Sequence, residues 1–192
     1  VGRAGIILDN LIARGQAQPM VVVMPLGYGT REVLSPLAPG TTRDPAITLR
    51  NRTRFKETLL SEVIPEAEKS YRVSRDRDSR AIAGLSMGGG QALTTGLSSP
   101  DRFAWVGAFS SGSLEDFDAT MPKLDANVNA KVRLLWIACG TNDDELIAPH
   151  RKLTGWLRAR KFPVTAVETP GGHSYMVWRE NLVQFAPLLF RP

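Results

Sequence analysis

Apolar residues follow two alternating patterns along the chain. Five segments are predicted to be helices, chiefly because apolar positions recur every three or four residues. These segments are residues 4–15, 54–71, 88–100, 145–161 and 174–190. Short continuous apolar runs between them predict strands. The runs lie within residues 19–29, 80–86, 103–112, 132–141 and 163–172.

The order of these segments predicts the fold class. Strands separated by helices are typical of an α/β fold in which a mostly parallel sheet is covered by helices on both faces. Residues 27–50 are rich in Gly, Pro, Thr and Arg, so we expect a long loop there. Pro65 should kink the helix that contains it. No repeat or linker divides the chain, and residues 1–192 are predicted to form one domain.

Composition and charge narrow the class of protein. The 192 residues are 43% hydrophobic, which suits one globular domain with a sizeable core. No apolar run approaches the roughly 18 residues of a membrane span, so no membrane partner is expected. The net charge is +5, but aspartates alternate with arginines in the basic stretch 71–80, so no nucleic-acid partner is expected either. Cys139 is the only cysteine, and its apolar flank favours a buried, unreactive thiol.

The stretch Gly84–Gly88, with the sequence GLSMG, matches the pattern G-x-S-x-G. In that pattern a serine occupies a sharp turn between a strand and a helix, with its hydroxyl above the sheet edge. Ser86 is therefore predicted to be a nucleophile. The backbone N–H of Met87, at the start of the helix, is predicted to stabilise an oxyanion. A plain glycine-rich turn of the dinucleotide-binding kind is the alternative, but it would carry glycine where Ser86 stands.

A serine hydroxyl needs a base to accept its proton, and the chain has two histidines. His173 follows the last predicted strand, at the sheet edge where open α/β sheets bind ligands. His150 lies inside a predicted helix, where we expect a surface side chain. His173 is therefore predicted to be the general base.

A carboxylate between the serine and the histidine in chain order would complete a catalytic triad. Asp143 and Asp144 both follow the strand predicted within 132–141. Counting from the strand end favours Asp143, whereas counting back from the next helix favours Asp144, and Asp143 is slightly preferred. Glu145 is less favoured because it lies further into the helix. The unused aspartate is expected to cap that helix.

Together these motifs resemble those of the esterase D-like branch of the α/β-hydrolases. The matching stretches are GLSMGGGQAL, IACGTND, GGHSYMVWR and PMVVVMPLGYG, spread over nearly the whole chain. The stretches MGGG after the serine and VWR after the histidine resemble the corresponding stretches of the feruloyl and acetyl xylan esterases of carbohydrate esterase family 1. This family includes esterase modules of xylanases. The branch also contains enterochelin-type and S-formylglutathione esterases.

This resemblance implies a serine esterase that removes feruloyl or acetyl groups from plant polysaccharide in xylan degradation. The ester would be cleaved through an acyl-enzyme on Ser86, without a cofactor or metal. The substrate would be a small ester or an acylated oligosaccharide, met outside the cytoplasm, so we expect a secreted or periplasmic protein. Tyr28 and Trp178 are candidates to line the substrate site, and each also suits a packing role.

The chain departs from the family pattern at its beginning. Family members have a strand that ends in an HG loop before the helix corresponding to residues 3–14, and this loop donates the second oxyanion N–H. We therefore expect these residues to be the C-terminal part of a longer domain or chain, with an upstream segment or a homo-oligomer completing the sheet. Three alternatives stay open: an acyltransferase that uses the same acyl-enzyme, an enterochelin-type or S-formylglutathione-type esterase of the same fold, and a non-catalytic binding domain.

Overall fold

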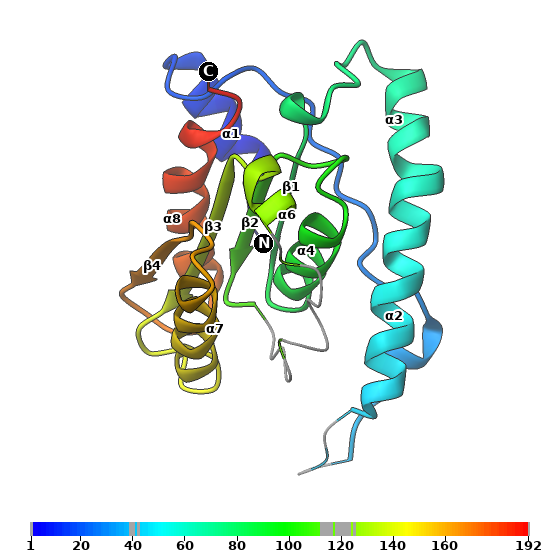
Figure 1. Ribbon diagram of the computed structural model, residues 1–192, viewed down its shortest axis with the longest axis vertical. Coiled ribbons are helices and arrows are strands. Elements are labelled where there is room, and N and C mark those ends of the chain that lie inside the picture. Colours follow the sequence, from blue (N-terminus) through cyan, green and yellow to red (C-terminus); the bar gives the residue numbers. More distant parts are fainter. Residues whose placement is uncertain are drawn as a thin grey trace. The chain divides into compact units, whose positions relative to one another are not determined.

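The computed structural model describes residues 2–38, 41, 43–111, 117, 124 and 126–191 (Figure 1). The chain divides into two compact units. The first unit comprises Val1–Met20 with Arg75–Pro192, and the second comprises Val21–Ser74. The predicted nucleophile and base both belong to the first unit.

The first unit contains a parallel four-stranded sheet with the strand order β1-β2-β3-β4. Its strands are β1 (Ala81–Leu85), β2 (Trp105–Phe109), β3 (Leu134–Gly140) and β4 (Thr165–Thr169). Because the strands are parallel, their carboxyl ends meet at one edge of the sheet. The helices of this unit are α1 (Ala4–Ala13), α4 (Met87–Ser98), α6 (Ala126–Lys131), α7 (Ile147–Ala159) and α8 (Tyr175–Phe185), with 3-10 turns η3 (Arg77–Ser79) and η4 (Ala186–Leu188).

The central strands β2 and β3 are buried on both faces, as their apolar runs predict, while the outer strands β1 and β4 are partly exposed. Successive residues of β2 and β3 point to opposite faces. One layer joins the sheet to α4 and α7 and includes Leu93, Leu97, Val106, Ala108, Leu135, Ile137, Leu153 and Leu157. The other layer joins it to α8 and includes Trp105, Phe109, Trp136, Ala138, Val177 and Phe185. The predicted α/β architecture of this unit is therefore confirmed.

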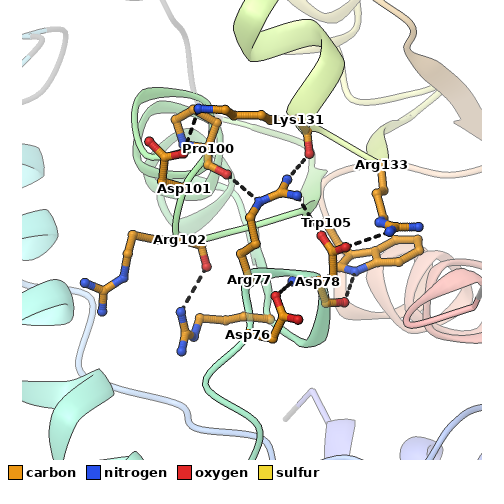
Figure 2. A network of polar contacts seen from close by, with 10 residues as sticks. Asp76, Arg77, Asp78, Pro100, Asp101, Arg102, Trp105, Lys131 and Arg133 are labelled. Atoms are coloured by element: carbon orange, nitrogen blue, oxygen red, sulfur yellow. Dashed lines mark hydrogen bonds and ion pairs between the residues drawn. The ribbon is translucent and has the colours of Figure 1, made fainter.

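A polar network closes the amino-terminal edge of the same sheet (Figure 2). The Arg77 guanidinium donates to the carbonyl oxygens of Pro100 (2.9 Å) and Lys131, and it pairs with Asp78. The Asp78 carboxylate also accepts from Arg133 at 2.6 Å, and the backbone carbonyl of Asp78 accepts from Trp105 Nε1 at 2.8 Å. This part of the basic stretch 71–80 ties the connections before β1, β2 and β3 together rather than forming only a solvated surface.

The second unit is mainly helical. It contains a 3-10 turn, η1 (Arg31–Leu34), and α2 (Pro45–Thr58), which runs through a π-helical turn, η2 (Leu59–Val63), into α3 (Ile64–Ser70). The helix continues past Pro65, and the wider turn precedes it because proline has no N–H to bond four residues back.

Two sequence predictions fail in this unit. The strand predicted within residues 19–29 is irregular, and Val21, Val22, Val23, Met24 and Leu26 are exposed. An apolar run becomes a strand only when neighbouring strands pair with it, and none of the described strands does. The loop predicted over 27–50 also ends early, because Asp44 caps α2 by accepting from the N–H of Ala46 at 2.8 Å. The Asp-Pro pair at 44–45 is the helix-start signal that this prediction overlooked.

Candidate active site

Ser86 occupies a strained turn between β1 and α4. Its backbone angles are φ 52° and ψ −123°, a region that costs a residue with a side chain about 1–3 kcal/mol. The surrounding chain holds this conformation: the N–H of Ser86 donates to the carbonyl of Phe109 at 2.8 Å, and its own carbonyl accepts from Gly89 at 3.0 Å. The turn places Ser86 at the carboxyl edge of the sheet.

Gly84 explains why the motif needs glycine before the serine. A Cβ on Gly84 would lie 2.2 Å from the carbonyl oxygen of Gly88, a distance that no side chain tolerates. The strand and the first turn of α4 therefore cross in direct backbone contact. That crossing makes the turn sharp enough to lift Ser86 out of the sheet.

The loops after β3 and β4 are joined in the same way. A Cβ on Gly140 would lie 2.3 Å from the carbonyl oxygen of Gly171. Two backbone hydrogen bonds span the loops, from Thr141 to Thr169 at 2.8 Å and from Asn142 to Gly171 at 2.9 Å. Consequently the segment carrying the aspartates and the segment carrying His173 are held together.

The structure brings Ser86, His173 and Asp143 into one hydrogen-bonded chain. His173 Nε2 lies 2.9 Å from Ser86 Oγ, and His173 Nδ1 lies 2.8 Å from Asp143 Oδ2. A carboxylate only accepts, so Nδ1 carries the hydrogen and Nε2 of the neutral ring accepts from the serine hydroxyl. The Asp143 side chain is 3% exposed and that of His173 is 40% exposed. The aspartate is thus shielded while the imidazole remains open to solvent.

Asp144, the other candidate, does not join this chain. It is exposed, as is Glu145, and neither carboxylate makes a hydrogen bond to the described residues. The expectation that the unused aspartate caps α7 is wrong, because the helix start has no side-chain cap. The carbonyl oxygen of Asp143 serves instead, accepting from Leu146 and Ile147 at 2.9 and 2.8 Å.

Two aromatic side chains form a series of ring contacts that starts at the histidine. The rings of His173 and Trp178 stand perpendicular with centroids 4.8 Å apart, and Tyr175 meets Trp178 in the same manner at 5.0 Å. Trp178 is 8% exposed, so most of the indole is packed among core residues. Tyr28 belongs to the second unit and is 43% exposed. Substrate contact by Tyr28 and Trp178 therefore stays a prediction.

The second histidine and the cysteine take no part in this hydrogen-bonded chain. His150 is 5% exposed, so the expected surface position is wrong; burial lowers the pKa of this histidine. The α7 face that carries it packs inward, and the sequence signal was Leu153, three residues on. Cys139 is fully buried, and burial raises the pKa of its thiol to about 11, in line with the predicted unreactive cysteine.

Described residues include no cluster of three or more His, Cys, Asp or Glu side chains suited to a metal ion. Within the same part of the chain, no helix has the length and apolarity to cross a membrane.

A strained serine turn, a histidine and a buried aspartate at the carboxyl edge of a parallel sheet define an α/β protein with a hydrolase-type site. The chain belongs to the Esterase family, whose pattern matches residues 2–189.

Three similar proteins refine this assignment. The chain is 30% identical over 191 residues to an endo-1,4-beta-xylanase/feruloyl esterase of Xylanibacter ruminicola, covering 99% of this chain and 24% of that protein. It is 27% identical over 162 residues to an acetyl esterase of Caldicellulosiruptor saccharolyticus, covering 67% of this chain and 60% of that protein. A solved ferulic acid esterase superposes with a TM-score of 0.73 at 28% identity, covering 97% of this chain and 75% of that one. The chain thus spans less than two thirds of either curated relative, and the α/β-hydrolase-type fold and the esterase family resemblance are both confirmed.

Proposed function

We propose that this protein is a serine esterase in which Ser86, His173 and Asp143 form the catalytic triad. One observation carries the proposal: the serine hydroxyl, the imidazole and the buried carboxylate form a continuous hydrogen-bonded chain, with distances of 2.9 and 2.8 Å. The strained backbone at Ser86 supports it, because strain of this kind persists where a side chain has to be presented to a substrate.

In the proposed reaction, Ser86 Oγ attacks the ester carbonyl while His173 Nε2 accepts the hydroxyl proton. The carbonyl oxygen becomes an oxyanion, to which we assign the backbone N–H of Met87, the first residue of α4, as one donor. The C–O bond to the alcohol then breaks, and His173 passes its proton to the departing oxygen. Water, deprotonated by His173, attacks the acyl-enzyme and releases the acid, which restores Ser86.

Asp143 has two roles in this scheme. Its carboxylate accepts from Nδ1 and so keeps Nε2 free of hydrogen in the resting state. It also stabilises the imidazolium that forms during each proton transfer. Both roles depend on its low exposure of 3%, because solvent would screen the charge.

The substrates we propose are feruloyl or acetyl esters of plant polysaccharide. The two curated relatives are named for feruloyl and acetyl esterase activity, and both similarities extend over most of this chain. Such a polymer is met outside the cytoplasm, so we propose a secreted or periplasmic location. For both acyl groups, the molecule bound would be an acylated oligosaccharide or a smaller ester.

The test compares the wild-type protein with Ser86→Ala, using methyl ferulate and p-nitrophenyl acetate. We expect turnover by the wild type and a fall of at least about 10³-fold in the variant, because the nucleophile is lost. Asp144→Asn is the matched control and should retain activity, since that carboxylate is exposed. Turnover that survives in Ser86→Ala would remove Ser86 from the mechanism. A folded wild type without activity on either ester would refute the proposed function.

A further inference from the structure

A tyrosine beside the triad has an exposed ring and no assigned role. Tyr175 is the first residue of α8, two positions after His173, and it is 41% exposed. No hydrogen bond to the described residues involves its hydroxyl. A half-exposed phenol at a reactive edge is a candidate for contact with substrate, because one end of the side chain is apolar and the other polar.

The ring of Tyr175 is held in place by its neighbours. Its centroid lies 5.0 Å from that of Trp178, which in turn lies 4.8 Å from that of His173, and both contacts are perpendicular. Gly2 lies beside the same ring, since a Cβ there would be 3.7 Å from Tyr175 Cε1. The tyrosine is therefore ordered before substrate arrives, which reduces the entropy lost when a ligand packs against it.

Exposed apolar side chains gather at this part of the first unit. Met87 directly follows the proposed nucleophile, and Tyr175 and Met176 follow the proposed base, with exposures of 37%, 41% and 70%. The sulfur of Met176 accepts from the Arg179 guanidinium at 3.5 Å, so this side chain turns along α8. Tyr175 is then the exposed aromatic ring at the end of the ring contacts that lead from His173 through Trp178.

The proposed mechanism decides which part of an ester lies beside His173. The imidazole returns its proton to the leaving alcohol, so the alcohol oxygen comes within hydrogen-bond distance of Nε2. The acyl carbon is bonded to Ser86 Oγ, and the acyl group extends from the serine. The ring contacts that lead to Tyr175 start from this imidazole, and the part of the substrate that reaches the imidazole is the alcohol rather than the acyl group.

We infer that Tyr175 is a specificity-determining residue that packs its ring against the sugar bearing the ester. A sugar has a face of C–H groups bordered by hydroxyls, which matches a ring with an apolar face and a polar edge. This inference rests on the proposed function and adds the alcohol side of the substrate to it. Its consequence is a preference for sugar esters over methyl esters of the same acid.

The experiment measures kcat/KM of Tyr175→Ala on a feruloylated arabinose oligosaccharide and on methyl ferulate, which share the acyl group. We expect a loss of roughly tenfold on the sugar ester, the effect typical of one lost apolar contact, and a loss of less than about twofold on the methyl ester. Tyr175→Phe should keep most activity on both substrates, because the ring face is retained. Val183→Ala, an exposed position on the same helix, is the matched control and should behave as wild type.

Each result has one meaning. Equal losses on the two esters, or no loss on either, would overturn the assignment of Tyr175 to the sugar. A tenfold loss on the sugar ester in Tyr175→Phe would refute packing by the ring. Wild-type turnover of both esters keeps the proposed function intact in all these cases, whereas a wild type inactive on both overturns the proposed function itself.

Discussion

Replacing Asp143 with asparagine tests the electrostatic part of the proposed triad, because the two side chains have nearly the same shape. In the wild type, Asp143 Oδ2 lies 2.8 Å from His173 Nδ1. A full charge pair at this distance is worth about 6 kcal/mol at an effective dielectric constant of about 20, an upper bound because the histidine is 40% exposed. Asparagine removes that attraction, and its amide N–H favours the tautomer with hydrogen on Nε2, which cannot accept from Ser86.

We therefore expect kcat/KM of Asp143→Asn to fall about 10³- to 10⁴-fold, equivalent to roughly 4 to 5.5 kcal/mol. The assay is hydrolysis of p-nitrophenyl acetate, with thermal unfolding measured alongside to show that the variant is folded. Asp144→Asn should stay within about twofold of wild type, since its carboxylate contacts none of the triad residues. A loss of less than tenfold in Asp143→Asn, or an equal loss in Asp144→Asn, would refute this reasoning.

Two further predictions concern stability. Burial lowers the pKa of His150 below its ordinary 6.5. Below about pH 6.5 the unfolded chain therefore binds a proton that the folded chain does not, and the protein becomes less stable as the pH is lowered. His150→Gln should therefore show a shallower loss of stability between pH 6.5 and 5 in urea unfolding; an unchanged slope would contradict this. Arg77→Ala should lose about 2 to 3 kcal/mol of unfolding free energy, because the carbonyls of Pro100 and Lys131 lose a charged donor. Arg102→Ala is its control, since this guanidinium bonds to no described residue in Figure 2, and equal losses would argue against the network.

Local patterns were sufficient for much of the first unit. The strands and helices around Ser86 and His173 follow from apolar runs and spacing, because a strand buried on both faces and an amphipathic helix each leave a short-range signature. Ser86 itself follows from the glycine at position 84, since only glycine permits the backbone crossing at Gly88. These predictions hold because their physical causes lie within a few residues of one another.

The same patterns misled where the outcome depends on distant partners. Val21–Met24 reads as a buried strand, but an apolar run records only a tendency, and pairing with another strand decides whether it forms one. His150 was expected on the surface, although its face of α7 packs into the core. In both cases the sequence describes the segment, and the packing around it determines exposure.

The choice between Asp143 and Asp144 shows where sequence information ends. By itself the sequence determined that an aspartate after β3 should face a histidine after β4, because parallel strands bring their carboxyl ends to one edge. Only the tertiary structure decided which aspartate does so. The backbone contact between Gly140 and Gly171 fixes the two loops together, and this contact turns Asp143 inward to His173 while Asp144 points to solvent. Asp143 and Asp144 are neighbours in sequence, so local patterns cannot separate them. The contact between Gly140 and Gly171, which lie 31 residues apart in sequence, sets the directions of the two side chains.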